Sequence, residues 1–354
     1  MESAIPEHLR CPRSRPAGSA PGHVPPNPAY TARFSKAQQQ MTMAFVGAQY
    51  RDAEGEALAQ AAVRRWAEGD EHAPDHHDIA FGTDAAGCHT LLWAAYWSDP
   101  RRFDAWKSKS AFARWWGCDD RLDEPCGWFM EVAQPRAERL ETLFSSPEGF
   151  EGVGRLAEHM SGEIREHGYW GSMRDRLPAS QFDPLDSSAT GVAPQPAPRA
   201  RIVLPGTENI ALIRSGQDWA ATQGKERDLY QDEVEPVLRK GMEFLDSTGG
   251  LAAGCLASRY LRALDSAFQP TLKSYGLSWW SSLEKMEQWA QGHSTHSSIF
   301  GTFMRMVQAM DFKIALRLSH EVAVLRADEL RFEYLNCHAQ TGLLRAAPAA
   351  APAG

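Results

Sequence analysis

The chain contains an internal repeat, and this feature constrains its fold more than any other. Two sets of large apolar residues share one spacing: Trp97, Phe103 and Trp106 in the first half, and Trp280, Met286 and Trp289 in the second. The strings Glu131-Val132-Ala133 and Glu321-Val322-Ala323 also match, and an Arg-Ala-acidic triplet follows each at the same distance. We infer that the chain was built from two copies of one unit.

Both halves show the same order of predicted elements. Each is expected to contain a strand, a helix, two strands, a helix and a strand. The predicted ranges are 43–46, 54–66, 78–81, 89–97, 100–116 and 127–133 in the first half, and 209–215, 223–245, 255–264, 271–280, 283–307 and 314–324 in the second. This βαββαβ order predicts an α+β fold of two ferredoxin-like units, whose open sheets cover one another.

The repeat divides the chain into five predicted regions. They are an N-terminal arm (1–33), a first ferredoxin-like unit (34–150), an inter-repeat segment and loop (151–205), a second unit (206–345) and a disordered tail (346–354). Proline-rich and alanine-rich composition marks the arm, the later part of the loop and the tail.

Composition excludes several classes of partner. The net charge is −8 and there is no basic block, which argues against nucleic acid or an anionic membrane as the partner and favours a small molecule. Twelve tryptophans and 15 phenylalanines suit a protein that encloses a flat, apolar group. The six cysteines are dispersed without a Cys-x-x-Cys pair, and we find no long apolar run, so we expect a reducing cytoplasm.

Two histidines in the second half stand out. Residues 314–324 alternate between apolar and other residues, which places His320 on an otherwise apolar strand face. His296 lies where a helical pattern interrupted by Gly292 restarts, and a helix N-terminus favours neutral imidazole. We interpret the pair as one metal ligand and one acid/base group. The alternatives are two hydrogen-bonded core histidines, or His293 as the ligand.

Comparing the two copies indicates where the second became specialised. His320 aligns with Met130, so the first copy keeps an apolar residue at that position. Ser215 aligns with Gly47, at the end of the first strand of its unit, which neighbours the last strand in this topology. Ser215 and His320 are therefore expected to share a pocket.

Three strings carry a resemblance to a known family. They are His167-Gly168-Tyr169-Trp170-Gly171-Ser172-Met173-Arg174-Asp175-Arg176, Leu212-Ile213-Arg214-Ser215-Gly216-Gln217-Asp218-Trp219 and Glu333-Tyr334-Leu335-Asn336-Cys337-His338. From about Glu2 to Arg345 the chain resembles the haem-containing aldoxime dehydratases. The resemblance implies a dimeric, α/β-barrel-like α+β fold with haem b, ferrous in the active state, in the C-terminal half. It also implies conversion of aldoximes, R–CH=N–OH, to nitriles.

Carried over residue by residue, the resemblance implies five roles. His296 is the proximal ligand of the haem iron, and His320 is the distal acid/base group. Ser215 and Arg176 hold the substrate hydroxyl and the distal network, and Glu141 supports the distal histidine. Imidazole suits this chemistry because hydroxide is a poor leaving group, and the departing oxygen needs a proton donor that titrates near neutral pH.

Some questions stay open at this stage. The sequence does not decide whether Arg174 or Arg176 faces the distal histidine, and Ser319 and the pair Ser278-Trp279 depart from the family pattern, which leaves the substrate preference open. Two alternative functions are a haem peroxidase or chlorite-dismutase-like enzyme, and a haem-binding sensor without turnover.

Overall fold

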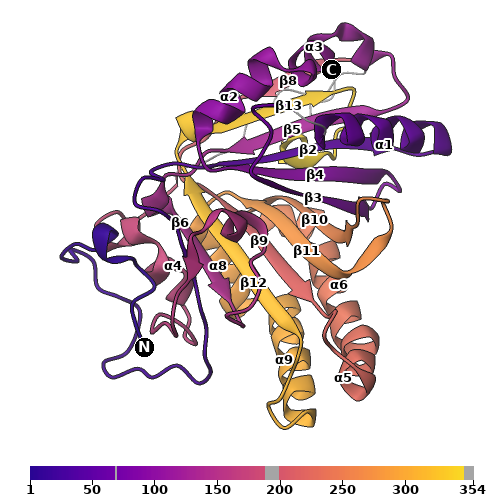
Figure 1. The fold of residues 1–354 in the computed structure, drawn as a ribbon. Helices are drawn as coiled ribbons and strands as arrows, with labels where there is room; N and C mark the ends of the chain where they lie inside the picture. Colours follow the sequence, from indigo (N-terminus) through magenta and orange to yellow (C-terminus); the bar gives the residue numbers. More distant parts are fainter. Residues whose placement is uncertain (68–69, 188–198, 347–354) are drawn as a thin grey trace, which may run out of the picture.

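One large antiparallel sheet forms the centre of the molecule (Figure 1). The computed structural model describes residues 1–67, 70–187 and 199–346, and in these its eleven strands follow the order β6-β12-β9-β11-β10-β3-β4-β2-β5-β13-β8. A separate small sheet pairs β1 (Ala32–Arg33) with β7 (His159–Met160). Most of the expected proline-rich loop and nearly all of the expected tail lie outside the described residues.

The first half contains the predicted elements in the predicted order. They are β2 (Thr42–Tyr50), α1 (Ala53–Ala67), β3 (His76–Thr83), β4 (His89–Trp97), α2 (Pro100–Lys109), α3 (Ala111–Gly117) and β5 (Gly127–Ala133). Helix α2 begins where the sequence indicates, because the Asp99 side chain accepts a hydrogen bond from the Arg101 N–H and Pro100 follows directly. The strands lie in the order β3-β4-β2-β5.

The second half repeats this arrangement. Its elements are β9 (Ile210–Asp218), α5 (Gly224–Leu229), α6 (Glu235–Leu245), α7 (Thr248–Ala252), β10 (Cys255–Leu264), β11 (Pro270–Trp280), α8 (Leu283–Gly292), α9 (Ser294–Ala309) and β12 (Arg317–Leu325). The helix predicted over 223–245 is interrupted by a π-helical turn at Tyr230–Val234, which ends two residues before Pro236, a residue without a backbone N–H. The strand order β10-β11-β9-β12 matches that of the first half.

Three further strands of the large sheet were not predicted, and two of them cross between the halves. They are β6 (Leu140–Phe144), β8 (Arg201–Leu204) and β13 (Leu330–Leu335). Strand β6 follows the first half in sequence but pairs with β12, whereas β13 follows the second half and pairs with β5. Each half therefore supplies a strand to the sheet of the other, and β6 is placed beside His320.

The expected barrel-like closure is wrong. Strands β3 and β10 pair and join the two halves edge to edge, but β6 and β8 remain at the two ends of the open sheet. The sheet curls enough for the inner faces of the halves to pack, with the rings of Phe45 and Trp279 6.5 Å apart. Closure would require β6 to pair with β8, but among the strands of this sheet β6 pairs only with β12 and β8 only with β13.

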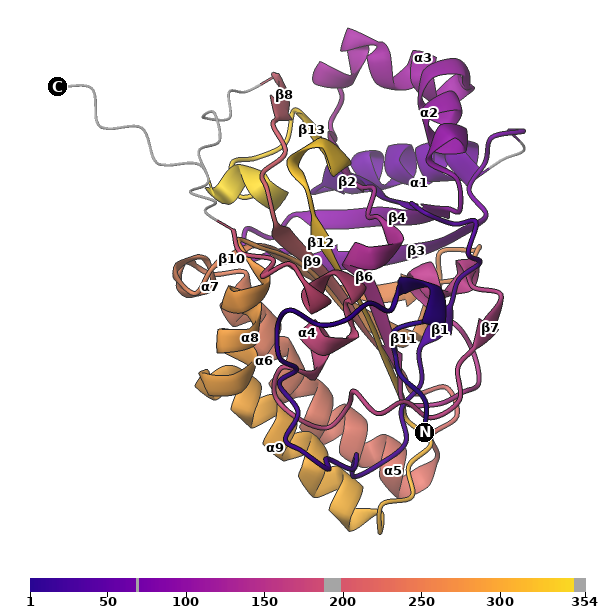
Figure 2. The same cartoon turned by 90° about the vertical axis from the view of Figure 1, so that its left-hand side faces the viewer.

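Helices cover the outer faces of the curled sheet (Figures 1 and 2). Helices α1, α2 and α3 lie over the first half, and α5, α6, α8 and α9 lie over the second. The helix layer of the second half packs on the β9, β11 and β12 face that carries Ala211, Trp280 and Val322. No helix among the described residues is long and apolar enough to cross a membrane.

The strand register corrects one detail of the alignment between the copies. His320 pairs with Ser215, and Met130 pairs with Val46. The residue that corresponds to Ser215 is therefore Val46, and not Gly47. The first copy has two apolar residues where the second has a hydroxyl and an imidazole.

The repeated carboxylates Glu131 and Glu321 are both buried between the halves, but in opposite electrostatic settings. Burial alone would raise the pKa of Glu131, but Arg259, which donates to both oxygens, and the hydrogen bonds from Trp279 and Tyr334 together lower it. Burial raises the pKa of Glu321 to about 7, and the Arg214 charge offsets this only in part. Glu321 accepts hydrogen bonds from the Tyr96 hydroxyl (3.0 Å) and the Val153 N–H (2.5 Å).

This difference predicts how stability depends on pH. The unfolded chain ionises Glu321 from its ordinary pKa of 4.5, whereas the folded chain retains the proton until about pH 7. Its contribution to the free energy of unfolding therefore falls as pH rises through this window, by up to about 3 kcal/mol, and is constant above it. Denaturant unfolding of Glu321→Gln should lack this slope. Glu131→Gln is the control, because Glu131 is ionised in both states across the window; parallel curves for wild type and Glu321→Gln would contradict the prediction.

Candidate functional site

Three side chains from three different elements meet beside strand β12. The Arg176 Nε donates to Glu141 Oε2 at 2.7 Å, and its Nη2 lies 3.2 Å from Glu141 Oε1 and 2.9 Å from His320 Nε2. Glu141 Oε1 lies 2.9 Å from the same His320 nitrogen. Arg176 and Glu141 are buried, while His320 is partly exposed. The cluster is closed to solvent on the ion-pair side and accessible on the imidazole side.

The exchange of β6 brings Glu141 to His320. In the β6–β12 register Leu143 lies opposite His320, and Glu141 lies opposite Val322. Glu141 is thus the diagonal neighbour of His320 on the same face, within reach of its side chain. Burial alone would raise the pKa of Glu141, but the charges of Arg176 and His320 outweigh it, and the pKa lies below its ordinary value.

Helix α4 (Ser172–Arg176) positions the arginine, and the N-terminal arm holds the segment before it. Arg176 Nη1 donates to the Glu166 carbonyl at 2.9 Å and lies 3.3 Å from the Ser172 hydroxyl oxygen. The Glu166 carboxylate in turn accepts from the Ala4 N–H at 2.7 Å. Residues at the start of the chain therefore help to fix the guanidinium beside His320.

The structure separates the two arginines that the sequence left open. Arg174 points to helix α8, where its Nη2 donates to Glu287 Oε2 at 2.7 Å, and its Nη1 donates to the Pro184 carbonyl at 2.6 Å. Arg176 is the one that contacts His320. Arg174 has the contacts of a structural ion pair between α4 and α8.

The His320 Nε2 lies between an acceptor and a donor. When this nitrogen carries a proton, it can donate to Glu141; when it does not, it can accept from Arg176. Each protonation state of Nε2 therefore has a partner already in place. Among the described residues, Nδ1 of His320 makes no hydrogen bond. This arrangement allows the ring to exchange a proton without rearrangement of its neighbours.

Ser215 lies directly opposite His320 in the β9–β12 ladder, so their side chains share one face of the sheet. This is the face covered by the helix layer. Ser319, which departs from the family pattern, lies on the other face beside Gly216. The departure at Ser319 is therefore remote from the side of the sheet that carries Ser215 and His320.

His296 lies in the first turn of α9, in the helix layer that covers this sheet face. Its ring packs edge-on against Trp289 at 4.8 Å, and Trp289 packs on Trp280 of β11. Burial lowers the pKa of His296. A backbone interaction with Ala290 raises the pKa and offsets part of this shift. The ring is therefore a neutral imidazole near pH 7, with a lone pair available to a metal.

His293, the alternative ligand, is engaged elsewhere. It is the N-cap of α9: its Nδ1 accepts a hydrogen bond from the Thr295 N–H at 3.3 Å and lies 2.9 Å from the Thr295 hydroxyl. Its ring also stacks on Phe244 at 4.2 Å. These contacts are those of a helix cap, and they leave His296 as the better candidate.

The residues between sheet and helices fit a haem. The Nδ1 of His296 is shielded from solvent and makes no hydrogen bond of normal geometry among the described residues, although the Ala290 backbone lies near enough to act on the ring. Along β12 the face toward the helices is buried at Val322 and Val324 but partly exposed at His320 and Leu318. Protein side chains therefore do not close over this level of the layer, where an apolar group can bind between the strands and α9.

His167 received no functional role from the sequence, but the structure places it close to the cluster. Its pKa is lowered to about 4 by burial and by the charges of Arg176 and His320, so the ring is neutral and close to the cluster. Its Nε2 is buried without a hydrogen-bond partner. In the sequence, its presence in the same motif as Arg176 could have indicated that His167 lies near the site.

The sequence and the structure both match known proteins. A model of the haem-containing dehydratases matches residues 44–343. The chain belongs to this family. Like other haem-containing dehydratases it uses haem.

Several members of the family are similar over nearly the full chain. Aliphatic aldoxime dehydratases from Rhodococcus erythropolis and Pseudomonas chlororaphis are 42% and 43% identical to it, with 98% of each chain covered. A phenylacetaldoxime dehydratase from a Bacillus species is 31% identical, covering 91% of this chain and 92% of its own. A crystal structure of an aldoxime dehydratase in complex with butyraldoxime superposes with a TM-score of 0.92 at 42% identity, covering 98% of this chain and 97% of that one.

Proposed function

We propose that the protein is a lyase that dehydrates aldoximes, R–CH=N–OH, to nitriles and water with the aid of haem. The observation that carries the proposal is the contact of His320 with Glu141 and Arg176, opposite Ser215, on the sheet face covered by the helix that carries His296. The family and the relatives support the same reaction.

The reaction removes a hydroxyl and a proton from neighbouring atoms. His296 would hold a ferrous haem b, which would supply an electron-rich iron centre able to weaken the N–O bond of a bound oxime. His320 in its protonated form gives its proton to the departing hydroxyl, which leaves as water. The neutral ring then takes the proton from the C–H carbon, so His320 ends the cycle as it began and atoms and charges balance.

The remaining residues orient this exchange. The Ser215 hydroxyl is placed to hydrogen-bond the oxime oxygen, because it lies beside His320 on the same face. Arg176 and Glu141 fix the His320 ring and accommodate both of its protonation states. Such fixed positioning lowers the barrier because the acid is held in place before the substrate arrives.

Three broader features also belong to this proposal. The matching strand orders of the halves support duplication of a ferredoxin-like unit, with the second unit (206–345) holding the haem and the first (34–150) serving as its support. We further propose a homodimer, which light scattering at twice 39.3 kDa would establish. All six cysteines are free, which suits the cytoplasm, and fractionation of the native cells would test that location.

Anaerobic turnover tests the function. The haem-loaded protein, reduced with dithionite, should convert butyraldoxime and phenylacetaldoxime to the corresponding nitriles, measured by gas chromatography. The alternatives predict other results: a peroxidase would oxidise a phenol with hydrogen peroxide, and a sensor would bind haem without turnover. No nitrile from a panel of alkyl and aryl aldoximes would overturn the proposal.

The two neighbouring arginines provide a matched pair of variants. Arg176→Lys retains the charge beside Glu141 but loses the planar fork that reaches both Glu141 and His320. We expect kcat to fall about 100-fold, with a smaller change in KM and with normal haem content, because the acid is no longer positioned. Arg174→Lys weakens the ion pair with Glu287 and should leave kcat within about threefold of wild type. Equal kcat values for the two variants would contradict this role for Arg176.

A further inference from the structure

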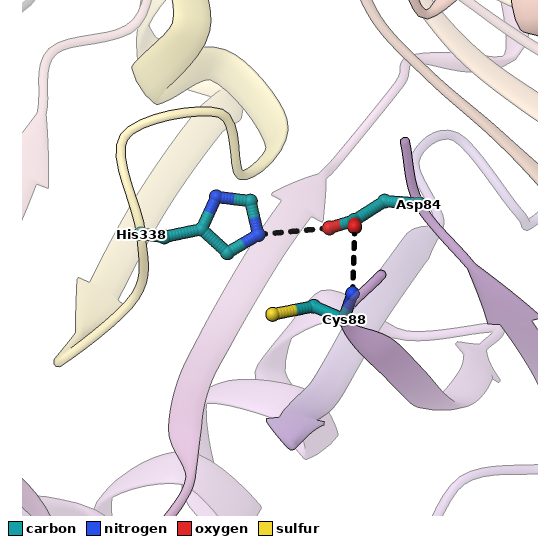
Figure 3. A group of neighbouring side chains, drawn as sticks. All are labelled: Asp84, Cys88 and His338. Carbon is teal, nitrogen blue, oxygen red and sulfur yellow. Dashed lines mark hydrogen bonds and ion pairs between the residues drawn. The ribbon is translucent and has the colours of Figure 1, made fainter. Parts of the chain in front are cut away.

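A second cluster of metal-ligand side chains lies in the first half, outside the site described above (Figure 3). Asp84 and Cys88 flank the turn between β3 and β4, and His338 lies in the segment that follows β13. His338 Nε2 is 2.8 Å from Asp84 Oδ2, and the three potential ligand atoms all lie within 4.8 Å of one another. Residues about 250 positions apart in the chain are thus brought together.

We propose that Asp84, Cys88 and His338 form a binding site for a divalent zinc ion. A thiolate, an imidazole and a carboxylate are the ligand types that zinc prefers, and three protein ligands leave the fourth tetrahedral position to water. Ligand atoms around zinc are roughly 3.3 to 3.8 Å apart, as bond lengths of about 2.0 to 2.3 Å require. The widest pair in the cluster therefore needs to approach by roughly 1 Å, which side-chain rotation can supply.

The carboxylate is already held in one orientation. Asp84 Oδ1 accepts hydrogen bonds from the backbone N–H groups of Ala86 and Cys88, each at 2.9 Å. These bonds leave Oδ2 directed to His338. Support of this kind around a ligand is typical of metal sites, where outer hydrogen bonds orient the coordinating group.

The thiol of Cys88 is free and shielded from solvent, with only 6% of the residue exposed. Figure 3 shows its sulfur extending to the same side of the turn as the His338 ring. A buried thiol of this kind is poorly accessible to oxidants or to a partner cysteine. A buried thiol can still bind a metal ion that its neighbours hold, so zinc coordination is compatible with the burial of Cys88.

Binding changes the protons of the cluster in a defined way. The Gln340 N–H donates to His338 Nδ1 at 3.1 Å, so Nε2 carries the ring proton and faces Asp84. Zinc takes the Nε2 lone pair, the ring proton moves to Nδ1, and the hydrogen bond from Gln340 is lost. Coordination of Cys88 as thiolate releases its proton, so one proton enters solvent for each zinc bound.

The consequence of binding is structural. The ion would fasten the β3–β4 turn to the segment after β13, which belongs to the second half in sequence but to the first in space. The competing interpretation is an ordinary His338–Asp84 ion pair that makes the same connection without a metal. Only the zinc site requires the Cys88 sulfur, because the ion pair involves His338 and Asp84 alone.

Metal analysis of the tag-free holoenzyme tests the proposal. The protein is equilibrated with zinc chloride, freed of loosely bound metal by gel filtration, and analysed for zinc and iron by mass spectrometry. We expect about one zinc for each chain in the wild type and at least a tenfold lower ratio in Cys88→Ser and His338→Gln. The glutamine side chain can still donate a hydrogen bond to Asp84. The His338→Gln variant therefore keeps a contact between the two segments while it removes the imidazole ligand. Cys118→Ser, at a cysteine elsewhere in the first half, should bind zinc like the wild type.

Two further measurements distinguish the site from adventitious binding. Zinc-edge X-ray absorption should show one sulfur at about 2.3 Å with lighter neighbours at about 2.0 to 2.1 Å. Zinc should also raise the Tm of the wild type but not of Cys88→Ser or His338→Gln. No retained zinc, retention unchanged in both variants, or a spectrum without sulfur would each overturn the proposal. None of these readouts depends on aldoxime turnover.

Discussion

Replacing His320 by alanine should lower kcat for aldoxime dehydration by about 10²- to 10⁴-fold, the usual contribution of a general acid or base. The variant should fold and bind haem normally. His320 is partly exposed, and its removal leaves Glu141 and Arg176 paired with each other at 2.7 Å. Steady-state turnover of the reduced enzyme, with haem content measured in the same samples, gives the result.

The structure offers a control one residue away. Ser319 follows the same strand but lies on the opposite face, beside Gly216. Ser319→Ala should therefore retain kcat within about twofold of wild type. Added imidazole should partly restore turnover in His320→Ala, because the deletion leaves room for a free ring at the same place. Wild-type kcat in His320→Ala would remove this histidine from the chemistry.

Replacing His296 by alanine should abolish stable haem binding, with an expected loss of affinity of roughly 100-fold or more. The ring is buried in the first turn of α9, its pKa is lowered by burial, and its Nδ1 makes no hydrogen bond of normal geometry among the described residues. The Soret absorption and iron content of protein reconstituted with haem and passed through gel filtration measure the effect.

His293 provides the matched control for this variant. His293→Ala removes the cap of α9, which should cost about 1 kcal/mol in the free energy of unfolding but leave haem content near that of wild type. Imidazole added during reconstitution should restore part of the haem binding of His296→Ala. Normal haem content in His296→Ala, or its loss only in His293→Ala, would move the ligand to another residue.

Much of the fold could be predicted from local pattern. The period of two over residues 314–324 and the Ser-Asp-Pro start of α2 predicted elements that the structure contains. The π-helical turn at Tyr230–Val234, the exchanged strands β6 and β13 and the edge strand β8 could not be predicted in this way. The residues of these three strands can pair with any free strand edge. Only the assembled sheet determines which edge each strand joins.

The candidate site was also predictable only in part from the sequence. The resemblance named Glu141, Arg176, Ser215 and His320, but their contacts depend on a strand exchange and on an N-terminal arm that holds Glu166 beside Arg176. The strand register also shows that the counterpart of Ser215 in the first copy is Val46, and not Gly47. One residue of shift reverses the face of a strand, so sequence spacing alone could not settle that alignment.

By itself, the sequence determined the repeated order of strands and helices and the presence of an imidazole at His320, where the first copy has Met130. These properties follow from periodicity and residue type, which act locally. Only the tertiary structure decided that the sheet stays open, that Arg176 rather than Arg174 reaches His320, and that Asp84, Cys88 and His338 converge. Each of these depends on contacts between distant segments, whose geometry is fixed by how the two halves pack.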